Sequence, residues 1–218
     1  IQETLPKNLE ALDDKYEIVL VDYGSTDGLS EWVWSNLEDY IKSKKLVLFE
    51  IDNEVRWNVA RAKNLAHRLA TGEYLFNLDA DNYLTPLCVN FIEKAKALNL
   101  HCWQWSGTVG DGSFGRIGIP KEKFIEIGGY DETLLPMGSQ DIDIIRRLNT
   151  FQKILRIPAP TRPAIQNSFK HKVNELMQPG ASEVEAKKTY GTVMNINLMI
   201  SKFKLETEGP IRAGGGFS

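Results

Sequence analysis

Short β-rich runs alternate with helical stretches through the first half of the chain, and this alternation constrains the fold more than any other feature of the sequence. In chain order, we expect a strand at 17–22, a helix at 29–41, a strand at 46–51, a helix at 58–70, a strand at 74–78 and a helix at 86–98. Strands that alternate with helices build βαβ units, in which neighbouring strands run parallel and helices cover the sheet. The sequence therefore predicts an α/β fold with a mainly parallel central sheet flanked by helices.

The pattern changes after residue 100. We expect strands at 101–106 and 114–119, and helices at 120–127, 139–148 and 183–201. A Gly-rich segment joins the two strands, which predicts a small antiparallel part of the sheet. Ser139 is expected to cap its helix. We expect one domain over residues 1–218, with a Pro-punctuated loop at 158–163 and a flexible tail at 206–218.

The composition argues against several classes of function. A formal net charge of −3 is unlike that of nucleic-acid-binding proteins, which need a basic surface. No apolar run reaches the length of a transmembrane helix and no signal peptide is recognisable, so we expect a cytoplasmic protein. The chain lacks an initiator Met, so we expect it to belong to a longer polypeptide, which leaves a luminal site or peripheral membrane association open. Cys88 and Cys102 are expected to be reduced, with a disulfide as the alternative.

The run 72–82 (GEYLFNLDADN) ends an apolar strand with two carboxylates, Asp79 and Asp81. Charged groups are costly to bury and like charges repel, so such a pair is favoured when a cation lies between them. Mg²⁺ and Mn²⁺ prefer oxygen ligands, and Mg²⁺ commonly binds one or two carboxylates together with substrate phosphates. By itself, a D-x-D triplet is equally consistent with an Asp-rich surface turn.

Asp22 ends the strand at 17–22 in the same way, and turn residues follow it at 24–27. Ligands of open α/β sheets bind beyond the carboxyl ends of the strands. Asp22 and Asp79 are therefore expected to open onto one crevice, which favours a metal–diphosphate site over a surface turn. Thr26 or Asp27 is expected to cap the next helix.

The helix expected at 58–70 carries basic and amide side chains. Arg61 and Asn64 lie on one side of it and could hold a base, a ribose or a phosphate beside the crevice. For Lys63, His67 and Arg68, a solvated helix face is the favoured interpretation.

Two acidic residues begin the helix expected at 139–148. Helical spacing places Asp141 on the apolar side and directs Asp143 elsewhere, toward Arg147. A carboxylate in the first turn is stabilised by the helix dipole and can accept a proton from a bound hydroxyl. Charge compensation at the helix start is the alternative. His171, which lies among lysines, is either a surface residue or a metal ligand.

Taken in order, the motifs of this chain resemble those of nucleotide-sugar-dependent glycosyltransferases with the GT-A fold, in family 2 and in the galactosyltransferase-like C-terminal region of chondroitin-type polymerases. The run 21–27 (VDYGSTD) resembles the D-D-G-S-T-D nucleotide loop, and 79–81 (DAD) resembles the D-x-D motif. The runs 128–132 (GGYDE) and 140–143 (QDID) resemble the G-G-[FY]-[DN]-E and E-D-x-D segments. The resemblance covers roughly residues 3–148.

The resemblance implies a donor site. Asp22 and Tyr23 would contact the uracil and ribose of a UDP-sugar. Arg61 and Asn64 resemble an A-R-N-x-G-type helix near the nucleotide, and Asp79 would reach the ribose or the metal.

The resemblance also implies a metal and a base. Asp81 would bind Mn²⁺ or Mg²⁺ together with Asp79, and His171 lies in the region where related enzymes place a third metal ligand. Asp141 resembles the catalytic base. The halves of the domain would be a nucleotide-sugar-binding half at about 1–106 and an acceptor and catalytic half at about 107–205.

The chain departs from the family pattern at three points. Tyr23 replaces the second Asp of the nucleotide loop, so base recognition would use stacking or the phenol hydroxyl. Gln140 replaces the Glu of the E-D pair, which affects acceptor binding but leaves the expected base. The usual first strand is missing, because Ile1 falls within what resembles the first helix of the family.

These observations predict a metal-dependent inverting glycosyltransferase of polysaccharide biosynthesis. It would move a hexose or N-acetylhexosamine from a nucleotide-sugar, in particular a UDP-sugar, to a hydroxyl of a saccharide or another acceptor. Trp103, Trp105 and Phe114 would then be either a stacking platform for sugar rings or core aromatics. A nucleotidyltransferase that makes sugar nucleotides and a catalytically impaired nucleotide-sugar-binding domain are the alternatives.

Overall fold

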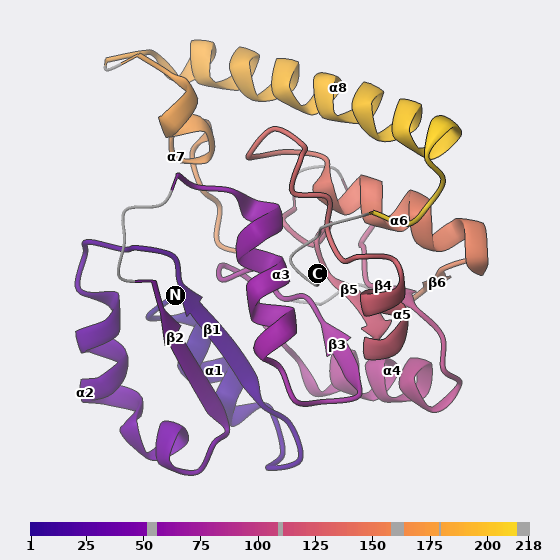
Figure 1. The fold of residues 1–218 in the computed structure, drawn as a ribbon. Coiled ribbons are helices and arrows are strands. Elements are labelled where there is room, and N and C mark those ends of the chain that lie inside the picture. Colours follow the sequence, from indigo (N-terminus) through magenta and orange to yellow (C-terminus); the bar gives the residue numbers. More distant parts are fainter. Residues whose placement is uncertain (52–55, 109–110, 158–163, 179, 213–218) are drawn as a thin grey trace. The chain divides into compact units, whose positions relative to one another are not determined.

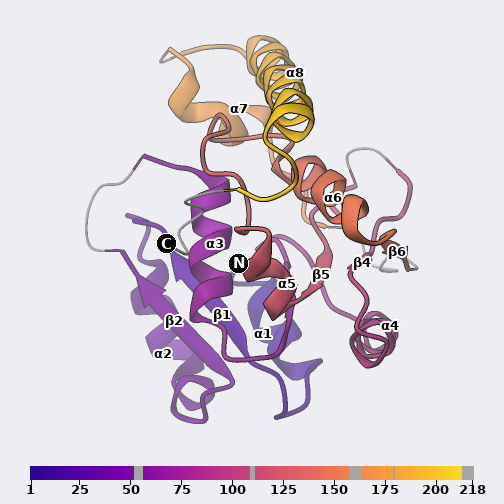
Figure 2. The same ribbon diagram turned by 45° about the vertical axis from the view of Figure 1, so that its right-hand side comes forward.

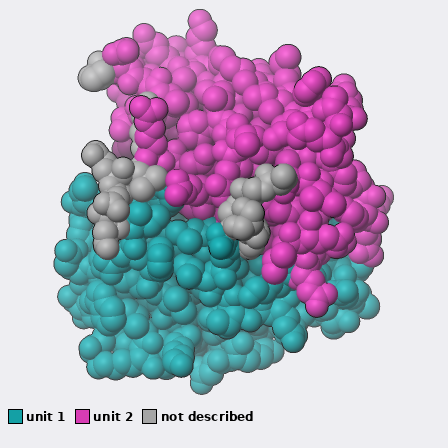
Figure 3. Space-filling model, viewed as in Figure 1, with its two compact units in different colours: residues 1–55, 65–121, 155–165 teal, residues 56–64, 122–154, 166–218 magenta. Residues whose placement is uncertain are grey.

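The computed structural model describes residues 1–51, 56–108, 111–157, 164–178 and 180–212. The loop expected at 158–163 and the last part of the expected tail, 213–218, lie outside the described residues. The chain forms two compact units (Figure 3). Unit 1 comprises residues 1–55, 65–121 and 155–165, and unit 2 comprises residues 56–64, 122–154 and 166–218.

The described strands all belong to unit 1 (Figure 1). Its elements are α1 (Thr4–Glu10), β1 (Ile18–Asp22), α2 (Leu29–Lys42), β2 (Leu46–Glu50), β3 (Tyr74–Phe76), α4 (Pro86–Ala97), β4 (Cys102–Trp103), β5 (Ile117–Pro120) and β6 (Leu155–Arg156). Helix α3 (Val59–Leu69) begins in unit 2 and ends in unit 1. The further elements are α5 (Lys121–Glu126), α6 (Gln140–Phe151), α7 (Phe169–Val173), the 3₁₀ turn η1 (Asn174–Leu176) and α8 (Glu183–Thr207).

The strands form a two-stranded sheet and a four-stranded sheet. In the first, β1 pairs with β2 in parallel, with Ile18 opposite Leu46. The second has the order β3-β5-β4-β6; β5 is antiparallel to both of its neighbours, and β4 and β6 are parallel. The α/β class is thus confirmed, and the expected antiparallel part is the insertion of β5 between β3 and β4.

The β1–β2 sheet is held by one apolar cluster. Leu5 and Leu9, one turn apart on α1, pack with Val33 and Leu37 of α2 and with Leu46 of β2. Full burial of a side chain of this size is worth about 1.5–3 kcal/mol. The helical spacing of these apolar residues therefore fixes α1 and α2 against the sheet.

Unit 1 also contains two buried thiols, one on α4 and one on β4. Cys88 and Cys102 are both free, so the expectation of reduced cysteines is confirmed. Tyr74 donates its hydroxyl hydrogen bond to Cys102 Sγ at 3.3 Å, and burial raises the pKa of both groups. A thiol that stays protonated in this way is a packing group and a poor nucleophile.

Unit 2 contains a buried network of opposite charges. Asp143 accepts from Arg147 Nε at 2.8 Å, and Asp131 accepts from Lys204 Nζ and Arg212 Nε, both at 2.8 Å. Arg212 also lies 3.5 Å from Asp143. Because a buried charge without a partner costs several kcal/mol, the members of this network depend on one another.

Helix α8 shapes the segment that leads into α6. Asn197, which is fully buried, donates to the carbonyl oxygens of Leu135, Met137 and Gly138 and accepts from Leu135 N–H at 2.8 Å. The amide thus replaces the backbone partners that this irregular segment lacks. At its own start, α8 carries a full capping box between Ser182 and Glu185.

The predicted cap of α6 is wrong in its chemistry. Ser139 precedes the helix as expected, but its φ of 69° is left-handed and its side chain does not cap. Instead, Ser139 Oγ donates to Met194 O of α8 at 3.1 Å. The Ser139 hydroxyl therefore bonds to α8 within unit 2, and is not available to cap α6 as local sequence reasoning predicted.

None of the described helices is long and apolar enough to cross a membrane.

Candidate functional site

The two carboxylates of the D-x-D run are each held by a neighbouring amide. Asn77 Nδ2 donates to Asp79 Oδ1 at 3.0 Å, and Asn82 Nδ2 donates to Asp81 Oδ1 at 2.7 Å. Both Asn side chains are buried, whereas both Asp residues are half-buried. The same amides are anchored to the backbone, Asn77 to Gly115 O at 2.8 Å and Asn82 to Gly112 O at 3.1 Å. The carboxylates are therefore oriented by rigid groups, as ligands of a metal centre commonly are.

A fully buried guanidinium lies behind this run. Arg116 donates to Asn82 Oδ1 at 3.4 Å, to Tyr83 O at 2.9 Å and to Gln104 Oε1 at 2.9 Å. Burial lowers the pKa of Arg116, and the negative charge of Asp79 acts in the opposite direction. Because a guanidinium stays protonated at neutral pH, Arg116 provides a fixed positive charge that offsets the repulsion between the acidic groups.

Asp22 lies at the carboxyl end of β1, as expected. Its side chain is buried, and Oδ1 accepts from Ser25 N–H at 2.8 Å, which closes the turn after the strand. Tyr23 is half-buried. In the same loop, Asp27 Oδ1 accepts from Leu29 N–H at 3.2 Å. The N-cap of α2 is Gly28, however, and no side chain caps the helix there, so the predicted cap by Thr26 or Asp27 is wrong.

The residues expected on one side of α3 differ in exposure. Arg61 is exposed, whereas Asn64 is buried and accepts from Tyr130 N–H at 2.8 Å. Asn64 Nδ2 donates to Tyr130 O and to Glu132 Oε1. Asn64 and Glu132 thus stabilise the G-G-Y-D-E segment of unit 2, which gives this amide a supporting role.

Asp141 forms an ion pair within unit 2. Its Oδ1 lies 2.8 Å from Lys63 Nζ, and the Lys63 side chain is only 11% exposed. The ammonium also lies 5.4 Å from the centre of the Tyr130 ring. The interpretation of Lys63 as part of a solvated helix face is wrong, and so is that of His67, which is buried; Arg68 is exposed, as expected.

The two acidic residues of α6 have different surroundings from those that helical spacing suggested. Asp143 pairs with Arg147, as predicted, but this pair lies on the buried side of the helix and is fully buried. Asp141 is half-buried. Gln140 is buried and donates to Leu135 O at 2.7 Å, so the residue in place of the family Glu stabilises the backbone.

His171 is exposed on the short helix α7, and its backbone N–H is capped by Ser168. Within the part of the chain that the structure describes, no group of three or more His, Cys, Asp or Glu side chains is arranged to hold a metal ion. The role of His171 as a third ligand stays a prediction.

The aromatic residues near β4 pack on one another. Trp103 and Trp105 are stacked with their ring centres 4.7 Å apart, and Phe114 meets both edge-on. The guanidinium of Arg156 lies 4.8 Å from the Trp105 ring. Trp103, Trp105 and Phe114 are all half-buried, so the three rings form a cluster between the core and the surface.

The site residues that the sequence did not predict are side chains that hold the acidic residues in place. Asn77, Asn82 and Arg116 support the D-x-D run, and Lys63 supports Asp141. The only signal in the sequence was the Asn on either side of the D-x-D run, at 77 and 82. Lys63 gave none, because its partner lies 78 residues away along the chain.

Comparison with solved structures shows the fold. The chain is similar to S. aureus TarS 1-349, with a TM-score of 0.56 and 13% sequence identity, over 95% of this chain and 70% of that one. A second S. aureus TarS structure gives a TM-score of 0.55 and 12% identity, over 89% of this chain and 41% of that one. At such identities the likeness shows the fold alone. No curated protein matches the chain by sequence.

The family model described as Glycosyl transferase family 2 matches residues 1–147. The match runs from α1 into α6, so it includes the turn after β1, the D-x-D run and Asp141. Both the predicted GT-A type of α/β fold and the predicted family are thereby confirmed, and glycosyl transfer is the activity that they support. The chain belongs to glycosyl transferase family 2.

Proposed function

We propose that this protein is a metal-dependent inverting glycosyltransferase. It transfers a hexosyl or N-acetylhexosaminyl group from a UDP-sugar to a hydroxyl of a saccharide acceptor. Membership of family 2 supports glycosyl transfer, and the D-x-D run with its supporting amides supports the finer assignment.

The observation that carries the proposal is the way in which Asp79 and Asp81 are held. Their oxygen atoms are the ligand type that Mg²⁺ and Mn²⁺ prefer. Amide donors from Asn77 and Asn82 fix the orientation of both carboxylates without neutralising them. The donor set therefore fits a divalent cation bound together with a diphosphate. The chemistry that such a cation supplies is stabilisation of the charge on the leaving diphosphate.

The residues of the chain have separate tasks in this proposal. Asp79 and Asp81 hold the metal and orient the donor diphosphate. Asp22 and Tyr23 bind the nucleoside, in keeping with their places at the carboxyl end of β1 and directly after it. Arg61 and His171 are further proposed contacts, to nucleotide and metal respectively.

Asp141 is proposed to remove the proton from the acceptor hydroxyl. The ion pair with Lys63 at 2.8 Å holds this carboxylate in place. The ionised form of a carboxylate is the form that accepts a proton. A positioned base typically contributes ~10²–10⁴ in rate. Inversion follows if the deprotonated hydroxyl attacks the anomeric carbon on the face opposite the diphosphate.

A donor screen tests the proposal. The protein is incubated with UDP-sugars and other sugar nucleotides, with Mn²⁺, with Mg²⁺ or with a chelator, and a set of saccharide acceptors. We expect metal-dependent release of UDP and an anomerically inverted product. Release of pyrophosphate would instead identify a nucleotidyltransferase. Donor binding without turnover on any acceptor would indicate an impaired binding domain.

Two variants separate binding from chemistry. Asp81→Ala is expected to abolish the metal-dependent part of UDP affinity, measured by calorimetry with and without Mn²⁺. Asp141→Asn is expected to lower kcat ~10²–10⁴-fold while UDP affinity survives. The exposed Asp39 of α2 offers a matched control, Asp39→Ala. Unchanged UDP affinity in Asp81→Ala would rule out its role as a ligand.

A further inference from the structure

One long side of α8 carries exposed apolar residues. Ile196, Met199 and Phe203 follow one another at intervals of three and four positions, so they lie in one row along the helix. Met199 is 72% exposed and Phe203 is 63% exposed. Apolar residues that gather on one exposed surface are the usual mark of a site that binds a partner. We call these three residues the α8 row.

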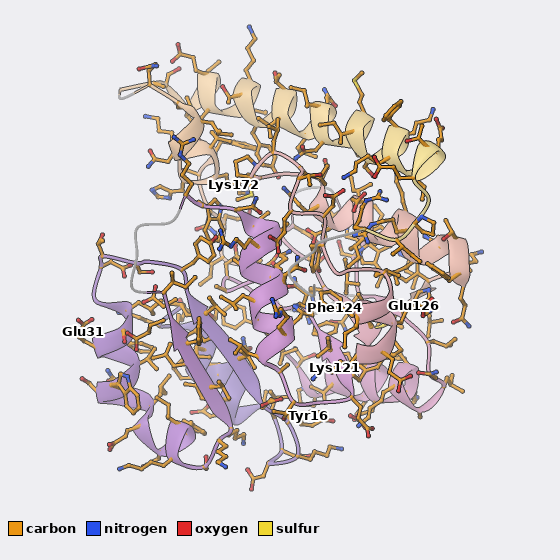
Figure 4. All side chains as sticks on the ribbon, viewed as in Figure 1. Tyr16, Glu31, Lys121, Phe124, Glu126 and Lys172 are labelled. Carbon is orange, nitrogen blue, oxygen red and sulfur yellow. The ribbon has the colours of Figure 1, made fainter. Side chains whose placement is uncertain are left out.

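The opposite side of α8 is packed within unit 2. The residues of the helix that are buried on this side are Ala186, Val193, Asn197 and Ser201. Phe169 of α7 lies 5.5 Å from Tyr190 of α8, measured between ring centres. Lys172 of α7, labelled in Figure 4, has its Nζ 5.7 Å from the centre of the same Tyr190 ring. In Figures 1 and 2, α6 and α7 both lie on one side of α8. The helix therefore has one side in the fold and one side, the α8 row, at the surface.

A shallow hollow of about 460 Å³ lies beside the first half of α8 within unit 2. Leu176 and Met177 line it from η1 and from the residue after η1. Thr192 of α8 lines it as well, and lies four positions before Ile196 on the side of the α8 row. The exposed side of the helix thus has a protruding aromatic ring at one end, Phe203, and a hollow with apolar walls toward the other.

The exposed side of α8 is symmetric about its own centre. Ile196 and Met199 lie equally far from the midpoint between residues 197 and 198, and so do Thr192 and Phe203. Two copies of a helix that pack antiparallel bring exactly such equidistant positions together. In that arrangement Ile196 of one copy meets the partner's Met199, and Phe203 meets the partner's Thr192 at the hollow.

Two charged residues continue this symmetry with opposite signs. Lys188 and Glu206 are both exposed, and they lie at nearly equal distances from the same midpoint. In an antiparallel pair of helices each Lys188 faces the partner's Glu206, whereas a parallel pair would place like charges together. Glu206 lies 3.9 Å from Lys202 of its own helix, but such an exposed pair contributes little. The charges therefore favour a second, antiparallel copy as the partner.

We propose that α8 forms a homodimer contact, in which two copies of the helix pack antiparallel through the α8 row. The contact is self-complementary about a two-fold axis, as in most homodimers. Helix α8 has 25 residues and is therefore about 37 Å long, which is enough for the apolar centre and for a Lys188–Glu206 pair at each end. The proposal is independent of the proposed sugar transfer, so its failure would leave that assignment unchanged.

A lipid surface is the competing partner, because a helix with an exposed apolar side can also lie on a membrane. Helices that do so have a mainly basic polar face, which anionic lipids attract. Helix α8 instead carries three glutamates and four lysines, and Glu206 lies on the side of the α8 row. This near balance of charge gives an anionic bilayer little to attract, whereas it matches a second copy of the same helix.

Sedimentation equilibrium over a range of protein concentrations tests the proposal. We expect a reversible equilibrium between monomer and dimer. Met199→Glu places like charges near the two-fold axis and is expected to raise the dissociation constant of the dimer by about tenfold or more. Leu98→Glu is the matched control, because Leu98 is an exposed apolar residue at the end of α4. Both variants change exposed side chains, so circular dichroism should show that both are folded.

A charge swap tests the predicted pairing. Lys188→Glu alone and Glu206→Lys alone are each expected to raise the dissociation constant by about tenfold, because each replaces two attractive contacts by two repulsive ones. The double variant Lys188→Glu/Glu206→Lys is expected to restore the wild-type value, because every contact again joins opposite charges. A double variant that is as weak as the single variants would show that these residues do not meet.

Disulfide capture tests the direction of packing. Cys88 and Cys102 are buried, so thiols introduced on α8 are the accessible ones. A mixture of Lys188→Cys and Glu206→Cys proteins, oxidised with glutathione disulfide, is expected to give a covalent dimer. Neither variant alone is expected to do so, because equal positions on antiparallel helices would lie roughly 25 Å or more apart.

Three results would overturn the proposal. One is a monomer at every concentration; if that monomer floats with phosphatidylglycerol vesicles and Met199→Glu does not, the α8 row binds lipid instead. Another is a dimer that Met199→Glu leaves unchanged, because the contact would then lie elsewhere. The third is covalent capture in each single cysteine variant alone, which would show parallel helices.

Discussion

Asp131 is expected to give the protein a defined loss of stability in acid. Its carboxylate is 2% exposed and accepts from Lys204 and Arg212, both at 2.8 Å, and from Thr133 Oγ1 at 2.6 Å. Burial acts to raise its pKa, but the hydrogen bonds from Lys204 and Thr133 outweigh burial and bring the pKa to about 2, below the usual 3.8. The folded state therefore binds the Asp131 proton more weakly than the unfolded state.

The sign and size of the effect follow from this difference. Because the folded pKa is depressed, the carboxylate stabilises the fold above about pH 4, and that contribution is lost as the pH falls toward 2. A shift of this size corresponds to about 2 kcal/mol, of which about half is lost by pH 3. The side chain is almost fully buried, so solvent screening does not reduce this value much.

Urea denaturation of the wild type and of Asp131→Asn at pH 7, 5, 4 and 3 measures the effect. At pH 7 the variant should be less stable by about 3–5 kcal/mol, because it leaves two cations facing a neutral amide. By pH 3 the difference should shrink by about 1 kcal/mol. Asp39→Asn, on the exposed side of α2, corrects for the change in net charge. A difference between wild type and Asp131→Asn that does not change with pH would refute the assignment of the low pKa to this carboxylate.

Two further predictions concern glycine and amide positions. Gly128 has a φ of 75°, and a Cβ there would overlap with Arg212 O, so Gly128→Ala should lower the free energy of unfolding by more than about 2 kcal/mol. Gly191, inside α8, is the matched control because a Cβ added there would meet no atom within 4 Å. Gly191→Ala should raise the free energy of unfolding by up to about 1 kcal/mol. Equal changes in the two variants, measured by urea denaturation, would contradict the steric argument. Asn77→Ala should weaken Mn²⁺-dependent UDP binding by about 10–100-fold in calorimetry, because it frees Asp79 to rotate, whereas the exposed Asn90→Ala of α4 should not. Equal affinities in these two variants would show that Asn77 does not position the carboxylate.

Local patterns were sufficient to predict most of the fold. Apolar runs such as residues 18–21 and helical spacing such as Val33 and Leu37 identified the elements from β1 to α4 to within a few residues. Two short elements were missed. Strand β6 has only two residues and exists because it pairs with β4, and α7 is a helix of five residues between loops.

In the candidate site too, local features could be predicted from the sequence and contacts between distant residues could not. The placement of Asp22 and the D-x-D run after strands could be predicted, because strand ends are a local property. The groups that hold them could not, because Arg116 reaches Asn82 from 34 residues away and Lys63 reaches Asp141 from 78 residues away. Helical spacing also placed Asp143 on the wrong side of α6, since it gave no weight to the buried cations Arg147 and Arg212.

The amide of Asn197 couples two stretches of chain that share no local sequence signal. It fixes the backbone of residues 135–138, some 59–62 positions earlier, and that backbone continues into the helix of Asp141. Turnover is therefore expected to be sensitive to a residue that meets neither donor nor acceptor. Natural substitutions at position 197 would then change the turnover rate without any contact to substrate. Mutant libraries that are restricted to substrate-contacting positions would not sample them.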